Sequence, residues 1–441
     1  MGRGNEVEEI GMIVGDKFFC NEEGVLLLQF PFFRSEVLQS ALRLMQDESM
    51  SKKPLIPLLV CILFGTTFWL PTVFAGNSLT TASVFGDHMV LQRGVFVPVW
   101  GTAEPGSMVK VSFAGKRYEA KTDGTGQWRL ALDSMKASAK SLRMTIASGG
   151  AELRVNDVLV GDVWFCSGQS NMQYQLEKCA DAEAVIAGAN HSNLRLNMGK
   201  GWSAATSESL PKFSGVAYFF GRKLHLDTGV PIGLIARALG GTPVEWWTPY
   251  SKLGRVAFAK AAMERSSEEW IQYEKTVADW KKRIGSASRQ KAGKKPQWMG
   301  TPESAVLESI YAPGKPGSLF AKHIEPIAGY GIRGVIWYQG ERNSKAGVDA
   351  SRAYRGLLAN MITSWREEWG QGDFPFIAVQ LPTYSKGGEA WAIVQESQAA
   401  AVGDVRNAAY IDIRDQPDDG LHPKNKKPVG ERLADLAIKQ F

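Results

Sequence analysis

A serine between an apolar strand and a helix is the strongest candidate for chemistry in this sequence. Residues 158–166 read VLVGDVWFC, and Ser170 follows in the segment CSGQSNM. A serine on a tight strand-to-helix turn presents its hydroxyl at the sheet edge, beside helical N–H groups that stabilise negative charge. The segment therefore predicts a nucleophile, although Ser170 fits an ordinary helix N-cap equally well. The GxSxG elbow is absent, which disfavours the α/β-hydrolase fold.

A serine nucleophile needs a base, and His422 is the best placed histidine. It lies in the segment DDGLHP, after the strand-like AAYIDI and before a helix that begins near Pro428. Asp419 stands three residues earlier, close enough to bond one imidazole nitrogen and leave the other facing Ser170. Polar loops also produce DxxH by chance. The other four histidines fall in helical text (His225, His323), in a polar loop (His191) and in the β-rich N-terminal part (His88).

Two further polar motifs follow predicted strands directly. Gly240 and Gly241 come after IGLIARAL, where missing side chains let backbone N–H groups approach an oxyanion. Gln339 comes after GVIWY and supplies an amide donor. Taken singly, the glycines fit a turn and Gln339 fits a core amide. Together with Ser170 and His422 they supply a nucleophile, two donors and a base at successive strand ends.

Four segments in the same order carry a family resemblance: GDVWFCSGQSNM, ARALGGTPVEWW, GVIWYQGERN and DGLHPKNKKPVGERLA. They resemble the sialate O-acetylesterase family, carbohydrate acetylesterases within the SGNH hydrolase superfamily. The segment FGDHMVLQRGVFVPVWGTAEPGSMVKVSFAG is similar to the β module that precedes the catalytic domain in bacterial members. The resemblance extends from about residue 82 to the C-terminus.

The resemblance implies a role for each matching residue. Ser170 is the expected nucleophile, His422 the general base and Asp419 the acid that orients it, with Asp418 as the competitor for that last role. The expected oxyanion donors are the backbone N–H of Ser170, a glycine of the pair Gly240 and Gly241, and the amide of Gln339. The expected substrate-binding residues are Trp246, Glu341 (as support behind the contact surface), Arg342 and Asn343.

The substrate implied by the resemblance is an O-acetylated carbohydrate, cleaved through an acetyl-enzyme without a metal or organic cofactor. Sialic acid and an acetylated polysaccharide such as xylan both stay open as the sugar. Arg342 stands where the family often has a small residue, and it fits either a sialic carboxylate or a surface salt bridge. The alternative from another class is an inactive carbohydrate-binding protein. Its sugar-stacking aromatics would be Trp246, Trp247, Trp337 and Tyr338.

The elements that position these residues indicate two folded parts. Residues 80–155 contain short β-rich runs with glycine and proline turns, typical of a small antiparallel β-sandwich. Residues 156–441 alternate buried strands with helices, which predicts a three-layer α/β/α domain of the SGNH-hydrolase type with a mostly parallel sheet. An insertion at about 257–295 carries an apolar helix stripe, which suits packing against a neighbour or a lid. The stripe consists of Trp270, Tyr273, Val277, Trp280 and Ile284.

Composition excludes several classes of protein. With 441 residues, 44% hydrophobic and 22% charged, the chain is a globular protein and not a disordered or multi-span membrane one. A net charge of +6 over this length does not indicate a nucleic-acid partner. Four cysteines without a CxxC pair give no zinc framework.

The N-terminal residues resemble an export signal. Residues 50–75 contain two lysines, an apolar run from Leu55 to Trp69 and a final Val73-Phe74-Ala75, which predicts a signal peptide with translation starting at Met50. Residues 1–49 would then be a misannotated or dispensable leader. An uncleaved membrane anchor is the alternative. The expected protein is secreted or periplasmic, has no membrane attachment after cleavage, and keeps Cys166 and Cys179 either as a disulfide or as two buried thiols.

Overall fold

The computed structural model describes residues 79–265, 302–417 and 420–441, the strands β1 (Phe18–Cys20) and β2 (Leu26–Leu28), and four single positions between 272 and 279. The chain has two compact units, Met1–Phe74 and Ala75–Phe441. In the first unit β1 and β2 pair antiparallel. The expected signal peptide and the apolar stripe of the insertion lie outside the described residues, as does the expected leader apart from these two strands.

The second unit begins with antiparallel strands. Their side chains alternate between the core and solvent: in β6, Val109 and Val111 are buried while Met108 and Lys110 are exposed, as a half-buried strand requires. One sheet contains β3 (Thr80–Thr81), β5 (Val97–Thr102) and β8 (Gln127–Leu132). A second group pairs β6 (Met108–Phe113), β7 (Lys116–Lys121) and β9 (Ser138–Ser148), and β9 pairs antiparallel with β10.

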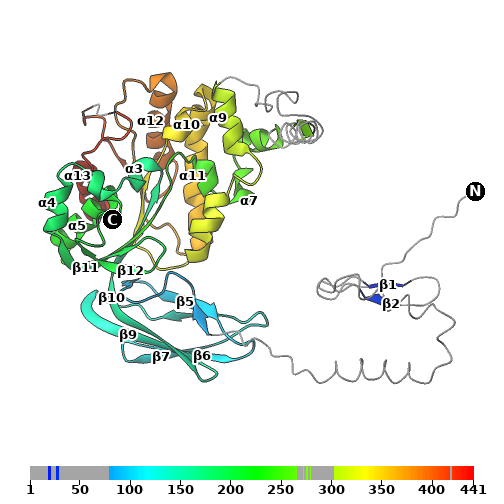
Figure 1. Cartoon of the computed structure of the whole chain (residues 1–441), viewed down its shortest axis with the longest axis vertical. Coiled ribbons are helices and arrows are strands. Elements are labelled where there is room, and N and C mark those ends of the chain that lie inside the picture. Colours follow the sequence, from blue (N-terminus) through cyan, green and yellow to red (C-terminus); the bar gives the residue numbers. More distant parts are fainter. Residues whose placement is uncertain are drawn as a thin grey trace, which may run out of the picture. The chain divides into compact units, whose positions relative to one another are not determined.

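Strand β10 joins this β-rich part to the rest of the unit. It runs through 18 residues, Ala151–Gly168. Its first part pairs antiparallel with β9 and parallel with β4 (Val90–Gln92), and its last part pairs parallel with two strands of the central sheet (Figure 1). Both parts belong to the compact unit Ala75–Phe441, and β10 is common to them, so the predicted separate sandwich domain stays a prediction.

The central sheet has the strand order β12-β11-β13-β10-β14-β15-β16, and every pair except β11–β12 is parallel. The strands in the middle of the sheet are apolar without alternation, as in β14 and β15, where every residue is buried. This confirms the predicted α/β class with a mostly parallel sheet. Besides β10, the strands are β11 (Asn190–Asn197), β12 (Trp202–Thr206), β13 (Ile232–Ala238), β14 (Gly334–Tyr338), β15 (Phe376–Val379) and β16 (Ala408–Ile411).

Helices cover both faces of this sheet. Figure 1 shows α5 (Gly215–Thr228) and α13 (Lys427–Gln440) on one side, and α11 (Val348–Trp369) and α12 (Gly388–Gly403) on the other. Trp365 of α11 packs edge-on against Phe165 of β10 and Trp337 of β14. The shorter helices are α3 (Ser170–Gln173), η3 (Leu176–Lys178), α4 (Ala182–Ala187), α6 (Val244–Trp247), α7 (Tyr250–Leu253), α9 (Pro302–Tyr311), η4 (Phe320–Ile324), η5 (Glu325–Ile327) and α10 (Glu341–Ser344).

One histidine lies in a different element from the one expected. The polar segment around His191 was predicted as a loop, but His191 lies in β11, which pairs with the edge strand β12. Its sequence, NHSNLRLN, is apolar only in its second half, which is the half that pairs with β13 and is buried. Local polarity therefore concealed a strand that the neighbouring strands stabilise.

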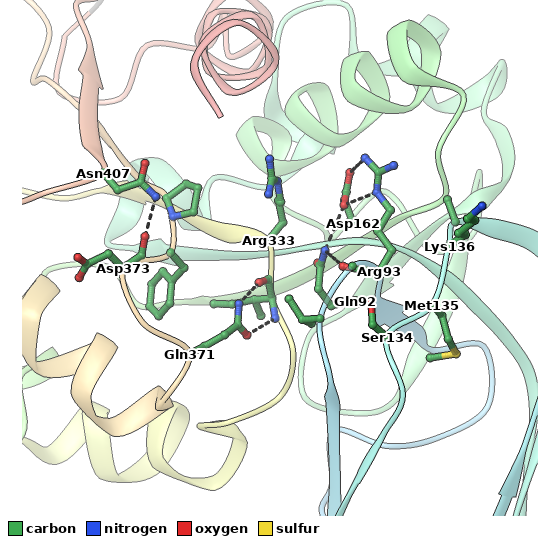
Figure 2. Close-up of a pocket in the computed structure, with 16 residues that line it drawn as sticks. Gln92, Arg93, Ser134, Met135, Lys136, Asp162, Arg333, Gln371, Asp373 and Asn407 are labelled. Carbon is green, nitrogen blue, oxygen red and sulfur yellow. Dashed lines mark hydrogen bonds and ion pairs between the residues drawn. The ribbon is translucent and has the colours of Figure 1, made fainter. Parts of the chain in front are cut away.

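A cavity of about 1030 Å³ lies at the amino ends of the parallel strands (Figure 2). Arg333, Pro375 and Asn407, which line it, stand directly before β14, β15 and β16. In its wall Arg93 is paired with Asp162, making two bonds of 2.8 Å to that carboxylate. Ligands of α/β sheets gather at the carboxyl ends of the strands, so this cavity is at the wrong end for the predicted chemistry.

Candidate active site

The structure brings Ser170 and His422 together across 252 residues of sequence. The imidazole Nε2 of His422 lies 2.8 Å from Oγ of Ser170. Ser170 is the first residue of α3, two residues after β10 ends, and His422 is on the loop before α13. The hydroxyl is half-buried and the imidazole is open to solvent on one side. At this distance the imidazole can accept the hydroxyl proton directly.

The turn between β10 and Ser170 depends on Gly168. Its φ of +141° is rarely adopted by L side chains, and a Cβ atom there would stand 2.1 Å from the carbonyl oxygen of Tyr338. The backbone N–H of Gln169 donates to that same oxygen at 2.9 Å, and the N–H of Leu239 donates to the carbonyl of Gly168. The ends of β13, β10 and β14 are thus held together, with Ser170 between them.

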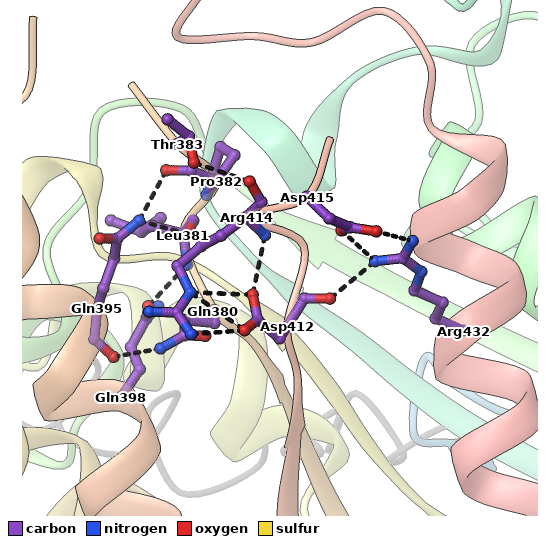
Figure 3. Close-up of polar contacts among 10 residues, drawn as sticks. All are labelled: Gln380, Leu381, Pro382, Thr383, Gln395, Gln398, Asp412, Arg414, Asp415 and Arg432. Carbon is purple, nitrogen blue, oxygen red and sulfur yellow. Dashed lines mark hydrogen bonds and ion pairs between the residues drawn. The ribbon is translucent and has the colours of Figure 1, made fainter. Parts of the chain in front are cut away.

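The loop that carries His422 is fixed on its upstream side (Figure 3). Arg432 of α13 donates to the carbonyl of Asp412 at 2.9 Å and makes two bonds of 2.6 Å to the carboxylate of Asp415. Thr383 donates to the carbonyl of Arg414 at 2.8 Å. The two candidates for the orienting acid, Asp418 and Asp419, lie outside the described residues, so the choice between them stays a prediction.

Asn171 connects the serine helix to the histidine loop. Its side-chain amide donates to Oε1 of Glu341 at 2.6 Å and to the carbonyl of Leu421 at 3.0 Å. Its Oδ1 accepts from Nζ of Lys426 at 2.5 Å. Asn171, Glu341 and Lys426 are all buried. Because Leu421 directly precedes His422, this network fixes the imidazole relative to Ser170.

The electrostatics favour a neutral imidazole at His422. Burial lowers its pKa from the usual 6.5, and the positive charges of Lys426 and Lys345 lower it further. Lys426 lies 4.9 Å above the ring of Tyr174, which stacks on the His422 ring at 6.4 Å. A neutral imidazole is the form that accepts a proton from Ser170. Burial also raises the pKa of Glu341 to about 7, opposed by its bond from Asn171.

The glycine pair lies beside Ser170. A Cβ on Gly240 would stand 3.4 Å from Cβ of Ser170 and 3.2 Å from Oε1 of Gln173, so this glycine lies directly beside the serine. The N–H of Gly240 donates to Oε1 of Gln173 at 2.8 Å. The backbone N–H of Gly240 therefore already donates a hydrogen bond to an oxygen atom, Oε1 of Gln173. Gly241 is exposed and has a φ of +72°, which closes the turn.

Gln339 does not lie at the surface of the site. Its side chain is fully buried, and Nε2 donates to Oε1 of Gln169, the carbonyl of Thr242 and Oδ1 of Asn343, at 2.8 to 3.2 Å. Its Oε1 accepts from the hydroxyl of Tyr354. In this structure its amide is bonded to protein groups beneath the surface, and the expected role as an oxyanion donor stays a prediction. It instead ties together the residues that follow β10, β13 and β14.

The four expected substrate-binding residues divide into two groups. Glu341 and Asn343 are fully buried, and Asn343 donates to the carboxylate of Glu245 at 2.9 Å, so neither contacts a substrate. Trp246 and Arg342 are half-buried. The indole of Trp246 donates to the carbonyl of Ile310, and Arg342 donates to the hydroxyl of Ser309 at 2.6 Å.

The aromatic set expected of a sugar-binding protein is largely internal. Trp247, Trp337 and Tyr338 have no exposed surface, and Trp247 packs edge-on against Trp337. They form the core beneath the strand ends and are not available to stack on a sugar. Their burial gives no support to the alternative of a carbohydrate-binding protein that uses these three residues.

Three residues with clear roles had no predicted one: Gln169, Asn171 and Lys426. Gln169 accepts from the backbone N–H of Arg342 at 3.1 Å and its amide lies 3.4 Å from Oγ of Ser170. All three are polar residues inside the motifs that carry the family resemblance, and their place in these motifs is the sequence signal that could have identified them. Because buried polar groups in folded proteins nearly always have hydrogen-bond partners, each was a candidate for a hydrogen-bond network.

The remaining candidates for unusual chemistry are structural. Cys166 and Cys179 are both buried free thiols, with pKa values raised by burial, to about 11 for Cys179. Within the described part of the chain, no group of three or more histidine, cysteine or acidic side chains is arranged to hold a metal ion. No helix among the described residues has the length and apolar character needed to cross a bilayer.

Asn171 supports a testable prediction. Replacing it by leucine keeps similar bulk but removes the bonds to Leu421 and Lys426, so the imidazole loses its fixed position. We expect the turnover that depends on Ser170 and His422 to fall about 10- to 100-fold, because small misplacements of a reacting group have effects of that size. KM should change less than threefold. An unchanged kcat in a folded variant would show that the network does not position His422.

Comparisons with known proteins agree with this geometry. A family model described as carbohydrate esterase, sialic acid-specific acetylesterase, matches residues 160–281 and 309–439. Human sialate O-acetylesterase is 27% identical over 413 residues, which cover 81% of this chain and 70% of that protein. The mouse protein of the same name is 28% identical, covering 81% and 73%. The crystal structure of a carbohydrate acetylesterase from Xanthomonas citri is 31% identical, with a TM-score of 0.63, covering 82% of this chain and 74% of that one.

Proposed function

Because the chain belongs to the sialic acid-specific acetylesterase family of carbohydrate esterases, we propose that it removes O-acetyl groups from sugars through a covalent acetyl-enzyme on Ser170. The single observation that best supports this mechanism is the 2.8 Å contact between Ser170 and His422. A hydroxyl and an imidazole in this relation form the reactive pair of serine hydrolases. The proposed fold type is that of the SGNH hydrolases, with the β-rich segment as an accessory sandwich.

The proposed reaction has two halves. Oγ of Ser170 attacks the acetyl carbonyl while Nε2 of His422 takes its proton. As the tetrahedral intermediate collapses, the bond to the sugar oxygen breaks and the imidazolium returns the proton to that oxygen, releasing the alcohol. Water then gives a proton to His422 and attacks the acetyl group. Collapse of the second intermediate releases acetate and restores the hydroxyl of Ser170.

The oxyanion is proposed to bind the backbone N–H groups of Ser170 and Gly240, with Gly241 shaping the turn. The backbone N–H of Gly240 donates to Oε1 of Gln173 in this structure, and the oxyanion would replace that oxygen as the acceptor. In enzymes of this kind, each such donor stabilises the transition state by about 3 kcal/mol. Asp419, with Asp418 as the alternative, is proposed to accept from the other nitrogen of His422.

The proposed substrate is an O-acetylated sialic acid, and an acetylated polysaccharide such as xylan is the second candidate. We propose that the protein itself is exported. Family membership supports a carbohydrate ester as the substrate class. The reading as an inactive carbohydrate-binding protein has less support, since three of its four aromatics are buried and the reactive pair is assembled.

The experiment is acetate release by the purified protein from O-acetylated sialic acid and from acetylated xylan, followed by reaction with a fluorophosphonate. We expect turnover of at least one substrate, loss of turnover after labelling, and a single mass increment on the peptide that contains Ser170. If acetate is released while the label lies on another residue, the proposed nucleophile is wrong. If neither ester is hydrolysed and no label is incorporated, the protein is a binder.

A further inference from the structure

A cavity of about 720 Å³ opens beside the catalytic loop. Leu421, which directly precedes His422, forms part of its wall, together with residues of α10, the start of α11, and the segment that enters α12. Binding sites for small organic molecules are usually between 300 and 1,000 Å³, so this cavity has room for a substituted monosaccharide. None of the residues predicted from the sequence to bind substrate lines it.

The chemistry of ester cleavage places the sugar on this side. His422 must deliver its proton to the departing sugar oxygen, so the sugar ring lies within reach of Nε2 of His422. Leu421, the residue before His422 in the sequence, is part of the cavity wall. Lys345, another wall residue, is one of the positive charges that lower the pKa of His422.

The wall combines one aromatic face with two cations. Tyr384 packs on Trp391 with ring centroids 5.0 Å apart, and Trp391 is itself held by a 3.0 Å bond to the carbonyl of Pro382. Lys345 and Lys386 are exposed and form no ion pair with any residue that the structure describes. The wall contains one acidic residue, Glu389, so its formal charge is positive.

We infer that this cavity is the subsite for the sugar, and that Lys345 and Lys386 bind the carboxylate of an acidic sugar while Tyr384 contacts its apolar face. This inference rests on the esterase function proposed above and adds the residues that distinguish acidic from neutral acetylated sugars. Two ammonium groups that have no carboxylate partner among the described residues give an anionic ligand charge-assisted hydrogen bonds. A neutral sugar has no carboxylate to accept such bonds.

The test compares two esters on the same variants. We expect Lys345→Gln and Lys386→Gln each to raise KM for O-acetylated sialic acid about five- to tenfold, and to leave KM for a neutral acetylated xyloside within twofold. Glu389→Gln should change KM for the acidic substrate in the opposite direction. Lys121→Gln, an exposed lysine on β7, removes the same charge from a distant strand and should change neither value. Rates are measured at pH 8, where His422 is neutral in every variant.

Direct binding separates this inference from the proposed function. Titration calorimetry with unacetylated sialic acid needs no catalysis, and the affinity should fall at least fivefold in each lysine variant. Equal effects of the lysine variants on acidic and neutral esters, or calorimetric binding that does not depend on the lysines, would overturn the assigned subsite even if esterase activity is present. Absence of acetate release from both esters, with lysine-dependent sialic acid binding, would instead reject the esterase and retain the subsite.

Discussion

Replacing Ser170 by alanine is expected to reduce kcat for acetate release by about 10⁴-fold or more, because loss of a serine nucleophile has effects of this size in enzymes that use a serine–histidine pair. KM for the acetylated sugar should stay within about threefold, since the hydroxyl is half-buried and its contact is with His422. The measurement is steady-state hydrolysis with a coupled acetate assay. Fluorophosphonate labelling should disappear in parallel.

Ser167→Ala provides a matched control for this substitution. Ser167 lies three residues earlier on β10, is fully buried, and has a hydroxyl without a hydrogen-bond partner in the described structure. Removing that hydroxyl should leave kcat unchanged and the melting temperature equal or slightly higher, since a buried polar atom without a partner is unfavourable. If Ser170→Ala and Ser167→Ala had the same small effect on turnover, the proposed nucleophile would have to be abandoned.

Replacing His422 by alanine is expected to lower kcat to a similar extent, about 10⁴-fold or more, and the two losses should not add in the double variant, because the pair acts as a unit. His191→Gln is the control. It changes a histidine on β11, two strands from β10 in the central sheet, and should retain normal turnover. A double variant with Ser170→Ala that is far slower than either single variant would show that the two residues act separately.

The pH dependence follows from the surroundings of His422. Burial and the charges of Lys426 and Lys345 disfavour the imidazolium, so the folded-state pKa is below 6.5. Activity needs the neutral form, which appears as pH rises through that pKa. We expect kcat/KM at pH 6.5 to exceed half its plateau value. A profile whose acid limb has its midpoint above pH 7 would contradict the assigned base or its environment.

The sequence predicted the roles of the reactive residues that follow strands better than the roles of the buried residues that support them. Ser170 and His422 were predicted as partners, and the structure places them 2.8 Å apart, because nucleophile and base are marked by residue type and by the apolar strands that precede them. Gln339 was predicted as an amide donor at a strand end, with a core amide as the alternative, and it is buried. Sequence shows that a polar residue follows a strand, and not which way its side chain points.

The support of the site was the least predictable part. Asn171, Lys426 and Glu341 form one buried network from three distant segments, and no local pattern says which buried polar groups will find one another. The strand at His191 was missed for a related reason, because its pairing partners and not its own polarity determine its structure. For Trp337 and Trp247 the sequence left a core position and a sugar-stacking position open, because aromatic residues serve cores and sugar sites alike, and both are buried.

The length of β10 has a consequence for how this protein can be altered by recombination. The strand that begins in the antiparallel part ends at the turn before the nucleophile, and Gly161 at its middle lies so close to Pro231 that a Cβ would be 1.9 Å from the carbonyl oxygen. In a chimaera, residues 80–155 would come from another protein. The strand that ends this new segment would have to continue, in register, into the remaining part of β10. Chimaeras joined at this boundary should therefore be recovered as folded protein less often than those joined in surface loops.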